Sequence, residues 1–251
     1  MKYYSEFDKK ILPPVLLLII VVAITLALLL KDKSKRVRSI PTALIAIALL
    51  FIEVIKQRWN IRGEFNYYHL PLHYCSLFVI LIPLGELCGS FGDRVFRPVA
   101  TYLSFTVAVG MYLFPQSILG GACENFGVTF YGTHSFIFHH LVVLYFALVL
   151  FLDLYKPSVR DIAKVGTLGI IYILIAIPAA YIFDENYCNF LTSTLDELEA
   201  YRLENGQLAY TAVISVFLTL GTMISSFIYY MINKIFAFFK LCFGMKPFED
   251  W

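Results

Sequence analysis

The chain has 251 residues, of which 59% are hydrophobic and only 15% are charged, and its mean hydropathy is +0.74. Apolar runs recur near the length that crosses a hydrocarbon core of ~30 Å, which is typical of a polytopic membrane protein and excludes a soluble globular domain. The net charge is +2 with basic residues spread along the chain, which excludes a nucleic-acid-binding surface. No connection is long enough for a separate soluble domain, so residues 1–251 are expected to form one membrane domain.

Seven membrane-spanning helices are predicted, which gives an all-α transmembrane bundle. The first apolar run is longer than that of a secretory signal, and no small-residue cleavage pattern precedes the basic stretch KDKSKRVR. It is therefore expected to stay in the mature protein. The predicted spans cover residues 12–31, 38–58, 70–89, 96–114, 133–153, 160–183 and 208–233.

The distribution of Lys and Arg predicts the orientation of the bundle. With the N-terminus outside, thirteen of these residues fall on the inner side and seven on the outer side. The difference comes mainly from KDKSKRVR, and the positive-inside rule places such a loop in the cytoplasm. The prediction is a multi-pass protein of the cell membrane with its N-terminus outside and its C-terminus inside. The long connections 115–132 and 184–207 would then lie outside.

Polar residues from three predicted helices reach one depth. Cys75 follows the start of the third helix, His139 follows the start of the fifth, and Glu53 precedes the end of the second. At ~1.5 Å of rise per residue, each lies about 8 to 9 Å below the outer boundary of the membrane. Ionisable groups at such a depth face the bundle interior and indicate a functional site or an internal network.

A thiol, an imidazole and a carboxylate are the groups that a cysteine-based acyl transfer needs. The thiolate is the reactive species, so Cys75 as nucleophile requires a base, for which His139 is the candidate, with Glu53 to orient it. Pro71 in the stretch LPLHYC predicts a helix start, which places the thiol near the positive end of the helix dipole. On a straight α-helix His73 and Cys75 lie about 200° apart, so they would face different surfaces unless the first turn is irregular.

The stretch LPLHYCSL resembles the LPLHLC-type signature of the YwaF-like bacterial integral membrane proteins, which are related to the eukaryotic transmembrane acyltransferase that remodels ether phospholipids. The resemblance covers roughly residues 50 to 215 and includes HHLVVL from His139 and NYCNFL from Asn186. The chain departs from the family pattern where His140 stands in place of the usual Gly and where Cys188 enters the NYCNFL run.

This resemblance implies a membrane-embedded lipid acyltransferase or acyl hydrolase that forms a thioester on Cys75, with His139 moving the proton. The implied partner is a membrane phospholipid or lysophospholipid, no cofactor or metal is expected, and the oligomeric state is left open. The ester bonds of a phospholipid lie just below its headgroup, at the depth of the proposed nucleophile. The residues expected to bind substrate are His73, His140, Asn186 and Tyr187.

Two other functions fit the same residues. A zinc-dependent intramembrane hydrolase would take its ligands from His73, Cys75, His139 or His140, because Cys and His both bind zinc. A proton-coupled transporter of a small solute would use the buried His and Glu residues, although the chain has no internal repeat. Glu86, near the inner end of the third predicted helix, is expected to be solvated or paired with a loop arginine.

Two cysteines, Cys123 and Cys188, fall in the two long outer connections. An oxidising compartment would permit a disulfide between them. The odd total of five cysteines leaves two free thiols as the alternative.

Overall fold

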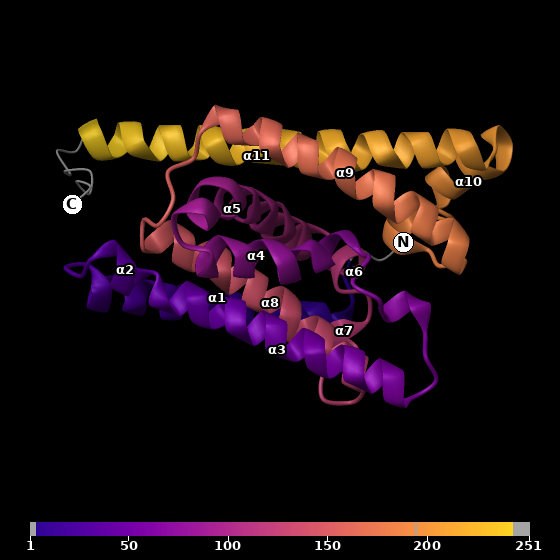
Figure 1. Cartoon of the computed structure of the whole chain (residues 1–251), viewed down its shortest axis with the longest axis horizontal. Helices are drawn as coiled ribbons and strands as arrows, with labels where there is room; N and C mark the ends of the chain where they lie inside the picture. Colours follow the sequence, from indigo (N-terminus) through magenta and orange to yellow (C-terminus); the bar gives the residue numbers. More distant parts are fainter. Residues whose placement is uncertain (1–3, 194, 243–251) are drawn as a thin grey trace.

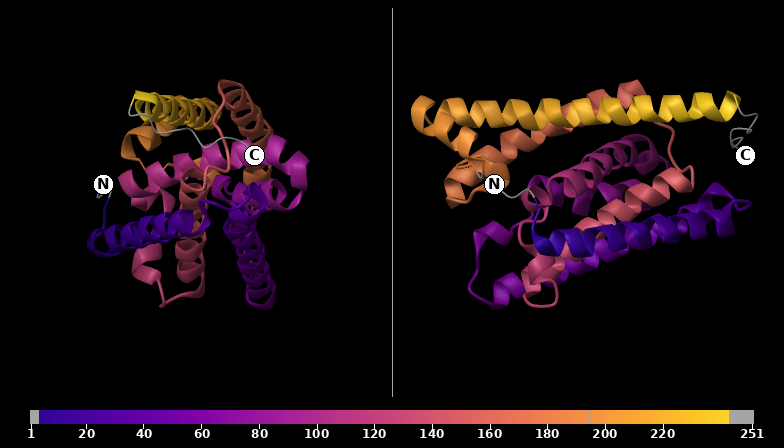
Figure 2. Two further views of the ribbon diagram at one scale, coloured as in Figure 1. Left: turned by 90° about the vertical axis from the view of Figure 1, so that its left-hand side faces the viewer. Right: turned by 180° about the vertical axis from the view of Figure 1, so that it is seen from behind.

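The computed structural model describes residues 4–193 and 195–242, with side chains as far as residue 235. Within this part of the chain all regular structure is helical, which confirms the predicted all-α class. Figures 1 and 2 show an elongated bundle whose long helices run lengthwise. The helices long and apolar enough to cross a membrane are α1 (Glu6–Leu30), α2 with α3 (Lys35–Arg38 and Ile40–Arg62), α8 (Phe130–Phe151), α9 (Val159–Phe183) and α11 (Gln207–Cys242).

The described residues thus support five candidate spans, because two of the seven predicted spans have a different form. The predicted span 70–89 contains only a short helix, α4 (Phe78–Leu87), after an irregular segment. The span predicted at 96–114 corresponds to α5 (Gly89–Leu113), which lies outside the five candidates. Polar residues lower the mean hydropathy of α5, and three of them have buried side chains: Arg97, Thr101 and Ser104.

α4 and α5 form a tight antiparallel hairpin. Gly89 reverses the chain with a φ of 58°, a left-handed conformation that glycine adopts without steric cost. A Cβ atom on Gly92 would overlap the carbonyl oxygen of Leu84 on the opposite helix. A Cβ atom on Gly85 would lie 3.0 Å from the backbone nitrogen of Arg97. Glycine at these positions therefore lets the two backbones approach closely enough to pair their side chains.

α9 and α11 pack against each other along one side of the bundle, and α5 lies between this pair and α1, α3 and α8 (Figure 1). Gly166 and Gly169 on α9 make room for Met223 and Thr219 on α11. Small residues at such contacts allow close packing of helices in lipid, where no hydrophobic effect drives helices together.

The two ends of the bundle carry different elements. The start of α1, the short helices α6 (Pro115–Ile118) and α7 (Ala122–Asn125), and α10 (Asp196–Asn205) lie at one end, and α2 lies at the other (Figures 1 and 2). The two long connections therefore share one end with the start of α1, as the predicted topology requires. Which side of the membrane this end faces stays a prediction.

Candidate functional site

Cys75 lies at the start of the helical segment that leads into the hairpin. A helix start at Pro71 was predicted, but His73 is extended (φ −73°, ψ 150°) and the first turn, Tyr74–Leu77, is a 3-10 turn. The helical stretch therefore runs over Tyr74–Leu87, and Cys75 lies closer to its positive N-terminal end than predicted. Because the first turn is irregular, the angular separation of a straight helix does not apply to His73 and Cys75.

Side chains from two other segments hold the backbone just before Cys75. The N–H of Tyr74 donates to Sγ of Cys188 at 3.0 Å, and the hydroxyl of Tyr172 donates to the carbonyl of Leu72 at 2.7 Å. The same hydroxyl oxygen lies 2.9 Å from Sγ of Cys188. These contacts occupy backbone groups that an α-helix would pair internally, which explains the late helix start. In the sequence Cys188 stands out as a departure from a family pattern and as a possible disulfide partner of Cys123, and nothing there indicates its contacts with Tyr74 and Tyr172.

Cys188 sits in a strained turn. Cys188 and Asn189 both have left-handed backbones, with φ of 51° and 61°, which costs a non-glycine residue roughly 1–2 kcal/mol. Their surroundings hold them there, since the hydroxyl of Tyr210 on α11 donates to the carbonyl of Asn189 at 2.6 Å. Burial raises the pKa of the Cys188 thiol, so this group is protonated at neutral pH.

His139 and His140 are buried on α8 and make the same local hydrogen bond. Nδ1 of each ring lies 2.7 Å from the carbonyl oxygen four residues earlier, that of Ser135 or Phe136. Because a carbonyl only accepts, Nδ1 carries the proton and Nε2 of the neutral ring keeps its lone pair. Neither Nε2 atom has a hydrogen-bond partner among the described residues. Each ring therefore presents an unused base inside the bundle.

The structure shows no direct contact between Cys75 and His139. No hydrogen bond joins them in the part of the chain that the structure describes. Both side chains lie within electrostatic reach of the Lys56 ammonium, and His139 is also within reach of His73. The predicted thiol and base thus both lie in the electric field of Lys56, whose direct partner is Glu53.

Glu53 belongs to a charged cluster instead of contacting His139. Its Oε1 accepts from Nζ of Lys56 at 2.8 Å and from Nε2 of Gln57 at 2.7 Å, and its Oε2 lies 3.6 Å from Nε2 of His134. The i, i+3 spacing brings Lys56 beside Glu53 on the same face of α3. Only 6% of Glu53 and 8% of Lys56 are exposed, so this is an interior ion pair. The carboxylate that was expected to orient His139 is therefore engaged elsewhere.

The connection between α3 and the helical stretch with Cys75, residues 63–73, is hydrogen-bonded to this cluster. Nε2 of Gln57 also donates to the carbonyl of His69 at 2.8 Å, and the ring of His69 stacks on Tyr131 of α8 with centroids 3.5 Å apart. Burial lowers the pKa of His69, so its imidazole is neutral at pH 7. The end of α3, the connection and the start of α8 therefore form one packed unit.

Tyrosines surround His73. Its Nε2 lies 3.1 Å from the carbonyl oxygen of Tyr68 and therefore donates to it. The ring of Tyr187 meets the imidazole edge-on at 5.2 Å, and its hydroxyl donates to the carbonyl of Tyr67 at 2.5 Å. Burial raises the pKa of Tyr187 to about 12, which keeps this donor protonated. Tyr187 thus fixes the position of the connection that carries His73.

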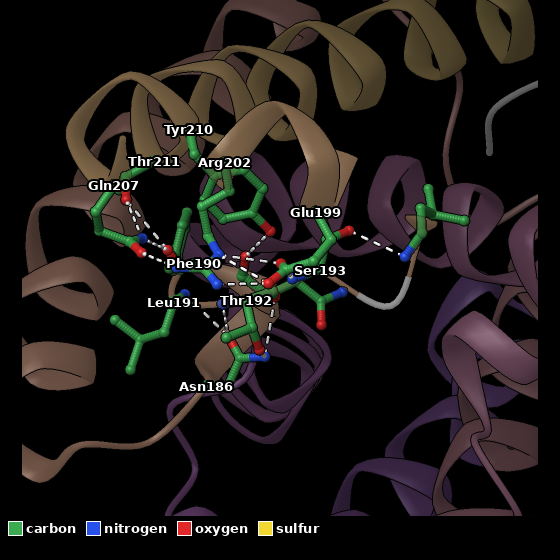
Figure 3. A network of polar contacts seen from close by, with 12 residues as sticks. Asn186, Phe190, Leu191, Thr192, Ser193, Glu199, Arg202, Gln207, Tyr210 and Thr211 are labelled. Carbon is green, nitrogen blue, oxygen red and sulfur yellow. Dashed lines mark hydrogen bonds and ion pairs between the residues drawn. The ribbon is translucent and has the colours of Figure 1, made fainter. Parts of the chain in front are cut away.

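Asn186 closes the turn that contains Cys188. Its Nδ2 donates to Oγ1 and to the carbonyl of Thr192 at 2.8 and 3.0 Å, and its Oδ1 accepts from the N–H of Leu191 at 2.9 Å (Figure 3). A few residues on, the N–H of Ser193 donates to Glu199 at 2.9 Å. The amide of Asn186, predicted to bind substrate, is occupied by these contacts.

A second buried ionic network centres on Glu86. Nε and Nη2 of Arg97 each donate to its carboxylate at 2.9 Å, and the two side chains are 5% and 0% exposed, respectively. The hydroxyls of Thr42 and Tyr145 donate to the same carboxylate at 2.5 and 3.1 Å. Glu86 is thus paired with an arginine, not solvated, and that arginine lies within α5. Because its acceptors are satisfied from three helices, this network is structural.

The described residues contain neither a disulfide nor a cluster of metal ligands. Cys123 and Cys188 are free thiols in different surroundings, the first beside Asp8 and the second beside Tyr74 and Tyr172. Of the two alternatives from the sequence, the structure therefore has free thiols. No three His, Cys, Asp or Glu side chains among the described residues could hold a metal ion together, so the zinc alternative finds no ligand set there.

This fold defines a polytopic α-helical membrane protein with buried imidazoles, ion pairs and one fully buried thiol in its bundle. The model of the TMEM164 family, a family of transmembrane proteins, matches residues 4–240. The chain therefore belongs to the TMEM164 family. No curated protein and no solved structure matches it. The membrane class predicted from composition is confirmed, and the resemblance to YwaF-like proteins and to an acyltransferase stays a prediction.

Proposed function

We propose that the chain is a membrane-embedded lipid acyltransferase or acyl hydrolase with Cys75 as the nucleophile and His139 as the base. The observation that carries the proposal is Nε2 of His139, a buried lone pair without a partner among the described residues. An unpaired buried polar atom costs free energy, so such an atom calls for a functional explanation. The start of a helical stretch at Tyr74 supports the role of Cys75, because a helix N-terminus stabilises a thiolate.

The proposed reaction has two half-reactions. The thiol proton of Cys75 passes to Nε2 of His139 while Sγ attacks the carbonyl carbon of a phospholipid ester. The ester C–O bond breaks, the departing lysolipid oxygen takes the proton, and the acyl group stays on Cys75 as a thioester. A lysophospholipid hydroxyl or water then gives its proton to His139 and attacks the thioester, which restores the thiol. Catalytic hydrogen bonds often shorten only when substrate binds, so the proposal requires the two side chains to approach in the complex.

The other candidate residues have supporting roles in this proposal. His73 and His140 would contact the lipid. Tyr187 and Asn186 would act indirectly, by holding the connection and the turn beside the site. Glu53 would act through Lys56 and His134.

The proposed topology has seven crossings, with α4 and its preceding segment, and then α5, added to the five candidate spans. The N-terminus would lie outside the cell membrane and the C-terminus inside. The excess of basic residues on one side supports this orientation. The shared end of the two long connections and the start of α1 fits the proposed crossings but not one orientation over the other. The site would then open toward the outer leaflet.

The test uses protein reconstituted with a phospholipid that carries a deuterated acyl chain and with a lysophospholipid acceptor. We expect labelled product by lipid mass spectrometry, and an acyl adduct on the intact protein that hydroxylamine removes. Cys75→Ala should lose both signals, while Cys88→Ala should keep both. Undiminished transfer by Cys75→Ala would overturn the proposal.

A proton-coupled transporter is the second candidate, and the cluster of Glu53, Lys56 and His134 favours it. Glu53 and Lys56 are buried and His134 lies beside Glu53, and titratable groups so arranged can carry a proton through a membrane protein. Proton flux into liposomes, driven by a solute gradient and abolished by Glu53→Gln but not by Cys75→Ala, would select this function. Acyl transfer without such flux would exclude it.

A further inference from the structure

Cys188 is a largely buried thiol whose contacts the proposed mechanism does not use. It lies 114 positions along the chain from Tyr74, yet its sulfur accepts the N–H of that residue at 3.0 Å. Tyr74 directly precedes Cys75. Cys188 therefore touches the backbone that carries the proposed nucleophile.

The donors and acceptors around Cys188 fix the direction of each hydrogen bond. The carbonyl of Leu72 only accepts, so the single hydroxyl proton of Tyr172 goes to it at 2.7 Å. The thiol of Cys188 must then donate to the hydroxyl oxygen of Tyr172 at 2.9 Å, while its sulfur accepts from Tyr74. The result is a directed chain from Tyr74 N–H through Cys188 and Tyr172 to the carbonyl of Leu72. Because the chain links Tyr74 to Leu72, it forms a closed ring with the backbone of His73. This ring fixes the conformation of the backbone immediately before Cys75.

Other contacts hold the turn that contains Cys188 in a fixed position. The turn containing it is left-handed at two successive residues, and Tyr210 of α11 holds the second of these, Asn189, by its carbonyl. Nε2 of Gln207 and the hydroxyl of Thr211 both donate to the carbonyl of Phe190 in the same turn (Figure 3). Four elements therefore converge on this point: α9 through Tyr172, α11, the turn itself and the start of the helical stretch Tyr74–Leu87.

We propose that Cys188 is a positioning residue, whose thiol, between Tyr74 and Tyr172, holds Cys75 in place for reaction. It touches no substrate and forms no acyl intermediate. The inference rests on the proposed function, in which Cys75 is the nucleophile. The effect of Cys188 on Cys75 can nevertheless be measured without any substrate, through the reactivity of the Cys75 thiol. Serine at position 188 keeps one donor and one acceptor, whereas alanine removes both, so the two substitutions separate the hydrogen bonds from the space the side chain fills.

The test measures how fast iodoacetamide alkylates Cys75 between pH 6 and pH 10, at intervals of ~1 pH unit around the ordinary pKa of a thiol. Cleavage after Arg62 and Arg94 releases residues 63–94, which contain Cys75 and Cys88, so all variants carry Cys88→Ala. The alkylation of Cys123, a buried thiol beside Asp8, is followed in the same samples as an internal control. Cys188→Ala, Cys188→Ser and Tyr172→Phe are compared with the parent.

We expect Cys188→Ala to raise the alkylation rate of Cys75 about fivefold, the factor that one lost hydrogen bond supports, and to change the pH dependence of that rate. Cys188→Ser should stay within about twofold of the parent with the parental pH dependence, and Tyr172→Phe should follow Cys188→Ala. Cys123 should react at its parental rate in every variant.

Two results would overturn the inference. One is a parental alkylation rate with the parental pH dependence for Cys75 in Cys188→Ala. The other is a parallel rise at Cys123, which would indicate general loosening of the fold. If Cys188→Ala does not fold, Tyr172→Phe decides, because it removes only the hydroxyl. Altered alkylation in a protein without acyl transfer would keep the positioning role and reject the proposed function, whereas transfer by a protein with unaltered alkylation would do the reverse.

Discussion

The backbone N–H of Tyr74 and the sulfur of Cys188 lie 3.0 Å apart, although 114 positions separate the two residues in the sequence. This contact joins the strained turn after α9 to the first turn of the helical stretch that contains Cys75. It explains why that stretch starts later than Pro71, and it gives a structural role to a residue that looked like an irregularity in a motif.

The proposed nucleophile and base should behave as one unit. Cys75→Ala and His139→Ala should each lower acyl transfer by about a thousandfold or more, and the double variant should be within a few-fold of either single variant. Reconstituted protein and initial rates over a range of lipid concentrations provide the measurement. Multiplicative losses in the double variant would show that the two residues act independently.

Removing only one partner of the buried Glu86–Arg97 pair should strongly destabilise the protein. Arg97→Met leaves a buried carboxylate without its partner and should lower the free energy of unfolding by about 3–5 kcal/mol. Adding Glu86→Gln should recover part of this loss, since the remaining group is neutral. Thermal unfolding in detergent measures both effects. As a matched control, Lys35→Met breaks the exposed pair with Asp93 and should change stability by less than about 1 kcal/mol.

The close approach of α4 and α5 should depend on Gly92. Gly92→Ala places a methyl group against the carbonyl oxygen of Leu84 and should destabilise the protein by about 1–3 kcal/mol, the usual cost of overpacking. Gly221→Ala on α11 meets open space, so it serves as the control and should be neutral or slightly stabilising. Equal unfolding temperatures for the two variants would contradict the packing argument.

The segment after Cys188 should lose the hydrogen bond between Ser193 and Glu199 at low pH. Hydrogen bonds from Arg202 lower the pKa of Glu199 from 4.5 to about 2, so the carboxylate that accepts from Ser193 is favoured in the folded state. Because the pKa of Glu199 is lower in the folded protein than in the unfolded one, the contact stabilises the fold above the unfolded pKa. This stabilisation is lost as the pH falls through about 2. Hydrogen exchange at the Ser193 amide should therefore stay protected at pH 4. Glu199→Gln should remove the pH dependence, and the exposed Glu204→Gln should not.

The predicted orientation can be checked at two exposed positions. With Cys88 replaced by Ala, a cysteine introduced at Glu197 should react with a membrane-impermeant thiol reagent in intact cells. A cysteine introduced at Ser34 should react only after the membrane is permeabilised. The reverse pattern would invert the topology and leave the helical fold unchanged.

Sequence alone was enough to determine the membrane class and most of the long helices. The helix predicted at 160–183 runs over Val159–Phe183, and the one predicted at 133–153 runs over Phe130–Phe151. These boundaries depend on apolar length and flanking polar groups, which are local properties of the chain. The burial of His139 and Glu53 also followed from sequence, because an ionisable group in a membrane segment must face the protein interior.

Only the tertiary structure decided which polar groups meet. Lys56, one turn from Glu53, takes the carboxylate that a depth argument assigned to His139, and Arg97 reaches Glu86 because glycines draw α4 and α5 together. Depth along a helix can be counted from sequence, but the direction of a side chain around the bundle depends on packing and on long-range hydrogen bonds. For the same reason Cys188 was identifiable as an unusual residue, and its contact with Tyr74 was not.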